Sequence, residues 1–512
     1  MTEFLSHFVF TLLLLLPVVL ISRSVVAGTK YSPILIIVVF GLLLGYIMNL
    51  TGIGDPGLPK FEMIGFTSGT TITALVVTFF TGGQKLRNTF MKPKLPDEDD
   101  VLLNEEEVVL GTKGTQLVFL VRAFFILVGI QAVMQIITGT KLDTLADFLP
   151  LIAFFGLSGA IIFIDSKAKI SNKRAYLGRG VVEILMILVV LLVAFYIASF
   201  FKDSTVLPAL PQIFFAMLLS SGLGMYFSNW RPGPTMRALL FGGIPMVLAA
   251  VFIIGGTRLV SAFGMEGMTQ VMAYGFFGQL FWMFVGIALL VFVGKSNHVD
   301  ILAPGMAGSL SHSGLTGACT AGDIGEVAKE RAPVMINIPF FGHVFVFTIL
   351  AFSADRGELY VFPGLIVVLV GILFTIWALK TLRNRDGERS EIKGLILFSL
   401  GWQLIAVFGG FTMLHFAGLE LHEAAMANSS AISHFGLFAS IQGEMFDVAG
   451  LSPELQPSAL ISFIFAMPFL IHPIVFGMFG KAMTDDGQMP KKVIAILAGL
   501  GVVGVLFSLI IL

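Results

Sequence analysis

The most polar of the otherwise apolar segments runs from Gly308 to His343 and carries side chains suited to binding an ion or a small solute. Its glycines weaken a continuous helix, and its hydroxyls lie beside backbone that a broken helix leaves without partners. Unwound carbonyls coordinate cations such as Na⁺, and helix N-termini attract anions. The candidate binding residues are Ser309, Ser311, Ser313, Thr316, Thr320, Asn337 and His343. A hairpin that serves only helix packing would show the same pattern.

A second polar segment, HEAAMANSSAISHFG, begins at His422. Side-chain amides and hydroxyls are hard oxygen donors, which suit Na⁺ or the hydrogen bonds of a carboxylate. The candidate binding residues here are Asn428, Ser429, Ser430 and Ser433.

Other polar side chains lie singly within apolar runs. Thr70 and Thr71 belong to GFTSGTTITALVVTFFTGGQKL and are candidate ligands, although such hydroxyls often bond to carbonyls of their own helix. Gln279 and Gln403 are candidate amides of a solute pathway, with hydrogen bonding between helices as the alternative.

Glu183 is the carboxylate best placed to carry a proton or cation. Ionisable side chains inside membrane spans are costly and usually functional. Glu183 follows the basic stretch that ends at Arg179, so it lies just inside an expected span and is a candidate proton or cation site. Reaching back to the cytoplasmic interface is its alternative role.

The surrounding elements are those of a membrane protein. Of 512 residues, 56% are hydrophobic and only 12% are charged, whereas a soluble chain carries about 25% charged residues. A net charge of -1 indicates no nucleic-acid partner, and a single cysteine, Cys319, excludes an intramolecular disulfide and a multi-cysteine metal site. The only clearly soluble stretch expected is the acidic loop 85–114, and no P-loop is present.

Apolar segments near the length of a membrane-spanning helix number about fourteen. We expect them at residues 8–27, 31–50, 62–82, 116–138, 147–164, 180–201, 207–228, 236–255, 269–294, 332–353, 359–380, 394–416, 457–480 and 490–511. The first lacks preceding basic residues and a clear cleavage site, so we expect a retained span rather than a signal peptide.

Basic residues set the expected orientation, because short cytoplasmic loops are enriched in Lys and Arg. Such loops follow the third, fifth and seventh spans, which places both termini outside. A full crossing at 301–322 or at 423–445 would put later basic clusters on the outer side, so both segments are expected to be re-entrant hairpins that enter from opposite sides.

The expected fold is therefore an all-α polytopic membrane protein with about fourteen transmembrane helices and two opposed re-entrant hairpins. We expect a first membrane repeat at 1–206, a second at 207–356 with the Gly/Ser/Thr-rich hairpin, and C-terminal helices at 357–512 with the second hairpin.

Several motifs resemble sodium/glutamate symporters. They are FFTGGQKL after an early span, the run LPALPQIFFAMLLSSGLGMYFSNWRP from Leu207, and APVMINIPFFGHVFVFTI after the first hairpin, together about half the chain. The resemblance implies inverted repeats, coupling to Na⁺ and a small carboxylate substrate. The chain departs from that family by lacking its Gly-His-Gly-Thr stretch in the first half and by continuing beyond the expected end.

The segments FEMIGFTSGTTITALVVTFFTGGQKLR and SAISHFGLFASIQGEMFDVAGLSPELQPSAL are also similar to monovalent cation/proton antiporters, which carry a buried mid-membrane aspartate. Glu183 is the nearest candidate for that role. An intramembrane enzyme using His312, His343, His415, His422 and His434 is a third hypothesis, although no HExxH pair or nucleophile elbow occurs.

From these observations we expect a non-enzymatic secondary transporter of the bacterial inner membrane. It would take up a small carboxylate or amino acid with Na⁺ by alternating access, with no cofactor other than the coupling ion. Elevator-type relatives are often dimers, which suggests a homodimer by analogy.

Overall fold

The structure is a computed structural model that describes the chain in separate stretches. They are residues 2–27, 33–52, 68–91, 113–139, 173–202, 212–230, 232–263, 268–310, 315–316, 318–319, 324–332, 334–335, 337, 361–384, 386–419, 421–432, 471, 474–475, 477–482 and 485–511. The expected spans 147–164, 332–353 and 457–480 lie wholly or mostly outside these residues.

The chain packs into two compact units, which are described separately. The first comprises Met1–Ala27, Ile36–Ser199 and Phe215–Thr257, and the second comprises Gly28–Leu35, Phe200–Phe214 and Arg258–Leu512. This is a division by packing. The expected division into repeats at 206 and 356 stays a prediction.

The helices that lie mainly in the first unit are α1 (Thr2–Val26), α2 (Pro33–Thr51), α4 (Ser68–Phe90), α6 (Lys113–Thr138), α8 (Lys173–Lys202), α9 (Gln212–Tyr226), α10 (Pro234–Ala238), η1 (Leu239–Gly243) and α11 (Ile244–Phe263). The segments α10, η1 and α11 follow one another without a break, so they form one helix with a π-helical turn. Arg23 of α1 donates a hydrogen bond to the carbonyl of Phe241 in that turn.

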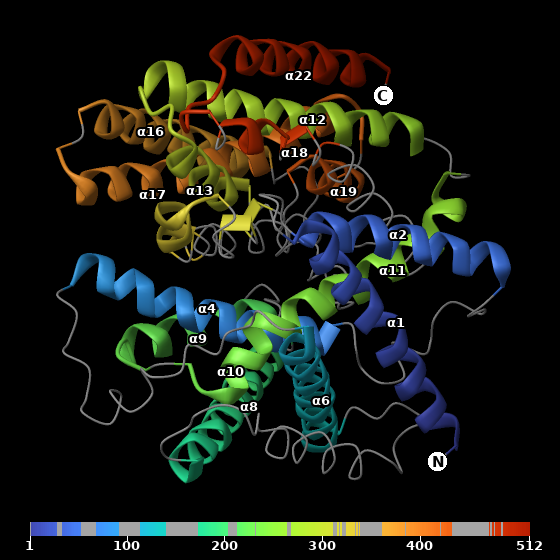
Figure 1. Ribbon diagram of the computed structural model, residues 1–512. Coiled ribbons are helices and arrows are strands. Elements are labelled where there is room, and N and C mark those ends of the chain that lie inside the picture. Colours follow the sequence, from blue (N-terminus) through green and yellow to red (C-terminus); the bar gives the residue numbers. More distant parts are fainter. Residues whose placement is uncertain are drawn as a thin grey trace. The chain divides into compact units, whose positions relative to one another are not determined.

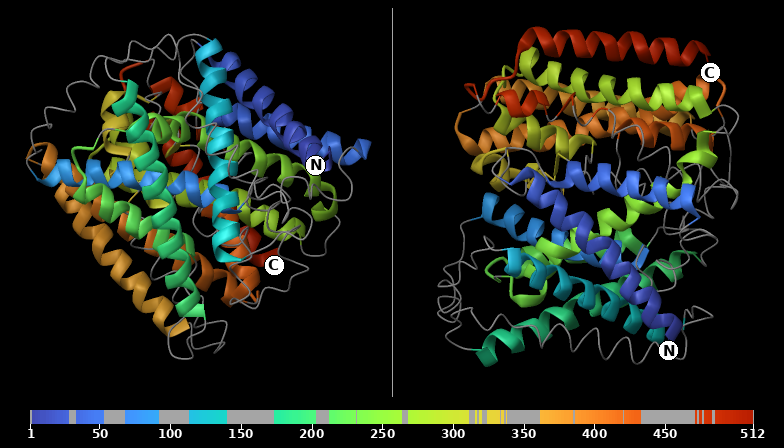
Figure 2. Two further views of the ribbon diagram at one scale, coloured as in Figure 1. Left: turned by 90° about the horizontal axis from the view of Figure 1, so that it is seen from below. Right: turned by 45° about the vertical axis from the view of Figure 1, so that its right-hand side comes forward.

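The helices of the second unit are α12 (Met268–Ala288), η2 (Leu289–Val293), α13 (Val299–Leu310), α16 (Val361–Arg383), α17 (Glu388–Leu404), η4 (Ile405–Gly409), α18 (Gly410–Phe416), α19 (Leu421–Ile432) and α22 (Lys491–Ile511). Here α12 continues into η2, and α17 continues through η4 into α18 (Figure 1). Helix α22 lies alongside α12, as Figure 1 and the right-hand view of Figure 2 show.

The expected all-α class is confirmed for the described residues, whose only β pairing is an isolated bridge between His298 and Gln488. Among these residues, seven helices are long and apolar enough to cross a membrane. The chain is therefore compatible with a multi-pass membrane protein. The total of about fourteen spans stays a prediction.

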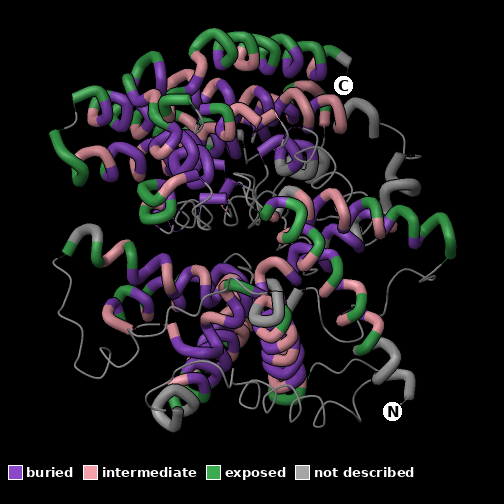
Figure 3. The backbone as a smooth tube through the Cα atoms, viewed as in Figure 1, coloured by how far each residue is buried: buried purple, intermediate pink, exposed green. Residues whose placement is uncertain are grey.

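The outer helices expose apolar side chains at helical spacing, as lipid-facing helices do. On α16 the exposed positions include Ile366, Leu369, Leu373 and Ile376, each at least 58% exposed. Exposed residues likewise follow one side of α22, where Ile510 is 82% exposed (Figure 3). Contiguous apolar surface of this kind is rare on soluble monomers, so these faces are suited to contact with lipid chains.

Small residues let helices of the first unit cross closely, which is a common form of membrane helix packing. A Cβ atom placed on Gly224 of α9 would collide with the carbonyl of Phe80 on α4, and one on Gly83 would collide with Ser221. Gln84 then donates hydrogen bonds of 2.8 and 2.5 Å to the carbonyls of Phe227 and Trp230, which follow α9. Helix α4 continues to Phe90, past the expected end of its span at residue 82. The first residues of the expected loop 85–114 are therefore helical.

Candidate functional site

The first predicted hairpin begins with α13, which lies in the second unit. Every residue from Ile301 to Leu310 is buried. Its described residues, Val299–Leu310, span about 18 Å at the α-helical rise. Helix α13 starts directly after η2 and the turn at 294–298, so it runs back alongside α12.

The residues that follow the first predicted hairpin lie against the first turn of α13. Gly325 has φ of +123°, and a Cβ placed on it would lie 2.7 Å from Oδ1 of Asp300, in the first turn of α13. The described residues on either side of the predicted hairpin therefore lie next to each other. This juxtaposition is the arrangement expected of a re-entrant segment, whose two ends are on one side of the membrane.

Of the residues predicted to bind in this hairpin, Ser309 is buried and its hydroxyl donates to the carbonyl of Met306 at 3.4 Å. Asn337 is also buried, and Thr316 is half-buried. The remaining candidates Ser311, Ser313, Thr320 and His343 lie outside the described residues.

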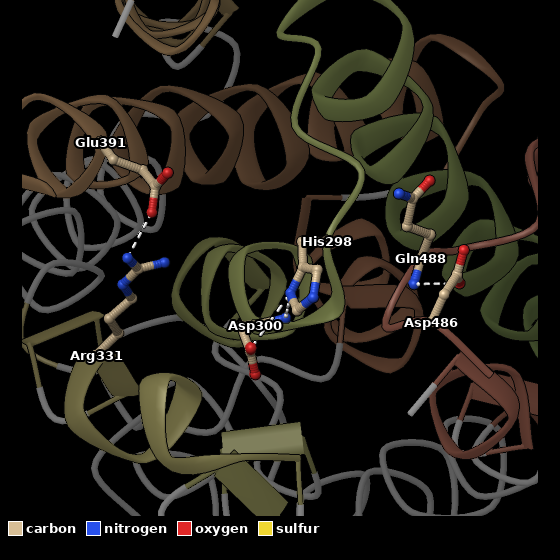
Figure 4. A network of polar contacts seen from close by, with 6 residues as sticks. All are labelled: His298, Asp300, Arg331, Glu391, Asp486 and Gln488. Atoms are coloured by element: carbon tan, nitrogen blue, oxygen red, sulfur yellow. Dashed lines mark hydrogen bonds and ion pairs between the residues drawn. The ribbon is translucent and has the colours of Figure 1, made fainter. Parts of the chain in front are cut away.

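Charged and polar side chains surround the base of the hairpin (Figure 4). Arg331 forms an ion pair of 2.5 Å with Glu391, in the first turn of α17, and both side chains are at most 13% exposed. Nδ1 of His298 lies 3.2 Å from Asp300, and His298 pairs with Gln488 in the segment before α22. These contacts tie the start of α13 and residues 324–332 to the starts of α17 and α22.

The second predicted hairpin begins with α19 of the second unit, which carries Asn428. The Asn428 amide group donates to the carbonyls of Ala406 and Val407 at 3.1 and 2.9 Å, and its oxygen accepts from the Tyr274 hydroxyl at 3.2 Å. Both accepting carbonyls belong to the π-helical turn η4. Asn428 therefore fastens α19 to two neighbouring helices, which is a structural use of the amide.

Of the three serines predicted to bind beside Asn428, the structure describes the side chain of Ser430. Ser430 is buried and donates to the carbonyl of Ala427 at 2.6 Å within its own helix. Ser429 lies in α19, but its side chain is outside the described part, as is Ser433. Gly410 leaves the space that the Asn428 amide fills, because a Cβ there would collide with the amide.

Helices α13 and α19 run in opposite directions along α12. In α19, Asn428 contacts Tyr274 and Ala431 contacts Gly278, so α19 runs parallel to α12. Helix α13 comes back from the other end, where Met306 contacts Gly286. The last described residues of the two helices, Leu310 and Ile432, are buried. The described parts of α13 and α19 thus pack against different stretches of α12 and run in opposite directions.

Glu183 lies in the first unit and is fully buried. Its carboxylate accepts backbone hydrogen bonds from Gly233, and from Thr235 and Met236 at 3.1 Å each. The indole N–H of Trp230 lies 3.4 Å from the same carboxylate. These donors belong to the first turn of α10 and the residues before it, so Glu183 caps the N-terminus of the long helix α10–η1–α11.

The local sequence explains why this helix needs a carboxylate from elsewhere. Gly233 occupies the N-cap position and has no side chain that accepts a hydrogen bond. Pro234 follows, which suits the first helical position because its missing N–H would have no helical partner there. Arg179 lies over the Trp230 ring at 4.4 Å and completes the cluster. The geometry favours a cap, which is a different role from the predicted proton or cation site.

The predicted threonine ligands lie on α4 of the first unit. Thr70 is buried, whereas the side chain of Thr71 is outside the described part. The nearby FFTGGQKL motif supplies the contacts of α4 with α9 described above. The motif thus has a packing role in this chain.

The histidines proposed for an enzyme are mostly outside the described residues. His415 is described, and its Nδ1 lies 3.1 Å from the carbonyl of Leu419. Within the described residues, no group of three or more His, Cys, Asp or Glu side chains is placed to hold a metal ion.

Sequence reasoning missed Gly410, Tyr274 and the π-helical turn η4 around Asn428. A glycine pair at 409–410 inside an apolar run was the only signal at that position. Comparison of the chain with models of known protein families, with curated proteins and with solved structures finds no match.

Proposed function

We propose that the protein is an ion-coupled secondary transporter that takes up a small carboxylate or amino acid together with Na⁺. The observation that carries this proposal is that the described residues on either side of the first predicted hairpin, Asp300 and Gly325, lie next to each other, as a re-entrant segment would place them. A transporter needs a site that is reachable from each side in turn, and discontinuous helices near the midplane supply such sites in many transporter folds.

The buried polar groups at this place support the proposal. Backbone and side-chain polar groups at membrane depth persist where they are buried in protein or line a watery cavity. Ser309 and Asn337 lie around α13, and Asn428 and Ser430 lie on α19, all of them buried. Side chains of this kind could bind an ion or a small solute, which is the use that the proposed transport requires.

The charge pattern supports an entry of the first hairpin from the cytoplasm. Basic residues gather at the ends of α16, α17 and α22 that lie near the start of α13, including Lys380, Arg389 and Lys491. Short cytoplasmic loops are enriched in such residues. The hairpin that starts with α13 would then open toward the cytoplasm, and the one that starts with α19 toward the outside.

An antiporter driven by Glu183 is the alternative within transport. The carboxylate of Glu183 already accepts three backbone hydrogen bonds, which hold it in place as a helix cap. This geometry favours symport, in which the hairpins rather than Glu183 carry the coupling.

The test is uptake into proteoliposomes that contain the purified full chain. Labelled amino acids and carboxylates are supplied with an inward Na⁺ gradient, and a pH-sensitive dye reports proton movement in the same vesicles. We expect saturable uptake of at least one solute that requires Na⁺. Uptake should fall in Asn337→Ala and stay unchanged in Asn384→Ala, a control at an exposed position. The proposal is wrong if no solute moves while added Na⁺ or K⁺ collapses a preset pH gradient.

A further inference from the structure

We propose that the end of α16 and the start of α17 form a binding surface for an anionic phospholipid. The phosphate of the lipid lies between Lys380, Arg383 and Lys393, and its acyl chains follow the exposed side of α16. This inference goes beyond the proposed function, because it names a lipid partner and does not depend on the solute that is carried.

The exposed residues of α16 form one stripe whose character changes along the helix. Lys380 and Arg383 are exposed in its last turn. They continue the spacing of three and four residues set by the exposed aliphatic side chains, and residues at this spacing lie on the same side of a helix. The stripe is therefore apolar first and basic at its end. Its apolar part consists of Ile366, Leu369, Leu373 and Ile376.

The apolar part of the stripe has the length of one bilayer leaflet. Ile366 and Ile376 are ten residues apart in the sequence, which is about 15 Å at the α-helical rise. The hydrocarbon core of a bilayer is about 30 Å thick, so one leaflet contributes about half of that. Lys380 lies about 6 Å beyond Ile376, and Arg383 about 10 Å beyond it. A leaflet whose acyl chains cover the apolar part therefore has its headgroups at the two basic side chains.

Helix α17 brings a third basic side chain to this stripe. The chain turns at residues 384–387, and α17 then packs closely against α16. A Cβ placed on Gly394 would lie 2.6 Å from Cγ of Leu382. Lys393 precedes Gly394 and is exposed, and its ammonium group lies 5.4 Å from the centroid of the Trp377 ring.

Trp377 marks the level at which the stripe changes from apolar to basic. It is 49% exposed and lies between Ile376 and Lys380 along α16. Tryptophan is enriched at membrane–water interfaces, where its ring lies at the headgroup level. An ammonium group over such a ring is held by cation–π attraction. The order along α16 is thus aliphatic, aromatic and basic, which is the order from the bilayer core to its headgroups.

The balance of charge at this place is positive. Glu391 forms the ion pair with Arg331 described above, so its charge is already matched. Among the described residues from 380 to 393, two exposed acidic side chains remain, Asp386 and Glu388. They are outnumbered by the exposed basic side chains, which are Lys380, Arg383, Arg389 and Lys393.

The chemistry of these groups favours an anionic headgroup. Lys and Arg bind phosphate oxygens through charge-assisted hydrogen bonds. A zwitterionic headgroup brings a cation of its own, which the basic side chains repel. Each basic side chain near an anionic membrane surface contributes about fivefold to binding. Phosphatidylglycerol, which has a phosphate and no cation, is therefore preferred to phosphatidylcholine.

The test is quenching of Trp377 fluorescence by brominated phospholipids, with the full chain reconstituted in vesicles. Brominated acyl chains quench tryptophans that they touch, and Trp377 is exposed whereas Trp282 and Trp402 are buried. A Trp377→Phe variant gives the background from the other tryptophans. The vesicles contain phosphatidylcholine and phosphatidylglycerol in equal amounts, with one of the two brominated at a time. We expect stronger quenching when phosphatidylglycerol carries the bromine.

Variants of the three basic residues show whether they cause this preference. Lys380→Gln, Arg383→Gln and Lys393→Gln should each lower the preference for phosphatidylglycerol at Trp377 about fivefold. Lys380→Arg and Lys393→Arg keep the charge and should keep the preference, which shows that the loss in the glutamine variants is a loss of charge. The control is the double variant Lys491→Gln, Lys492→Gln, which removes two exposed charges from α22 and should leave the preference unchanged.

Three results would overturn the inference. The first is equal quenching by the two brominated lipids in the wild type. The second is an equal loss of preference in the α22 control, because the lipids would then respond to the overall charge of the protein. The third is loss of the preference when inorganic phosphate is added at constant ionic strength, which would assign the three side chains to a soluble anion. Solute uptake is measured separately, so each of these results leaves the proposed function standing.

Discussion

Replacing Glu183 with alanine gives the sharpest test of its role as a helix cap. The substitution removes the acceptor of three backbone N–H groups at the start of α10, all of them inside the first unit. A buried donor left without an acceptor costs about 1–3 kcal/mol. Taking the low end for each donor, we expect Glu183→Ala to destabilise the protein by about 3 kcal/mol.

A graded series refines this expectation. Glu183→Gln keeps one accepting oxygen but turns an N–H group toward the remaining donors, so we expect roughly half the loss seen with alanine. Thr235→Val removes only the hydroxyl bond to the Gly180 carbonyl, which is 2.9 Å long, and should cost about 1 kcal/mol. Glu330→Ala changes an exposed glutamate and serves as the control.

The assay is the fraction of protein that stays monodisperse on size exclusion after stepwise heating in detergent. Heating of a large membrane protein is often irreversible, so all variants need the same heating rate. The order of stability should be wild type and Glu330→Ala, then Thr235→Val, then Glu183→Gln, then Glu183→Ala. If Glu183→Ala is as heat-stable as wild type while ion-driven proton movement is lost, the cap argument is refuted and Glu183 is a proton site.

Three further predictions concern other contacts and use the same heating assay. Gly224→Val should lower the stability by about 1–3 kcal/mol through overpacking, because its side chain would meet the Phe80 carbonyl. Gly222→Val is the control, since a side chain there points into open space and should cost little stability. Equal stability of the two variants would contradict the close crossing of α4 and α9. Asn428→Leu should cost about 2 kcal/mol, because two buried carbonyls and a tyrosine hydroxyl lose a partner; unchanged stability would mean that α19 is held by other contacts. Arg331→Met and Glu391→Met should each lower the stability by about 3–5 kcal/mol, because each leaves a buried charge without its partner. The double variant should lose clearly less stability than the sum of the two single variants. Additive losses in this double-mutant cycle would rule out coupling between the two charges.

The class of fold could be predicted from the sequence because the signal is carried by composition and by segment length. Long apolar runs form helices in a bilayer, since each backbone group must find its partner within the segment. The expected spans 116–138 and 359–380 match α6 and α16 closely for this reason. The bilayer imposes the constraint locally, so no knowledge of neighbouring helices was needed.

The roles of individual polar residues could not be predicted in the same way. Glu183 looked like a proton site because its carboxylate lies just inside a span, but its partners are around fifty residues away in the sequence. Asn428 looked like a ligand, yet its hydrogen bonds depend on a π-helical turn that exposes two carbonyls. No local sequence pattern predicts such a π-helical turn, whose freed carbonyls are bound here by a side chain from another helix.

Three glycines of the second unit determine where α13 and α19 pack along their neighbouring helices. Ala431 fits against Gly278, Met306 fits against Gly286, and the Asn428 amide fills the space at Gly410. Eight residues separate the two glycines of α12, or about 12 Å along the helix. Helix α19 packs at the first of these glycines and α13 at the second. Glycines thereby determine where α13 and α19 pack along α12. Composition suggests such a role, because small residues let membrane helices approach closely, but it does not assign that role to particular positions.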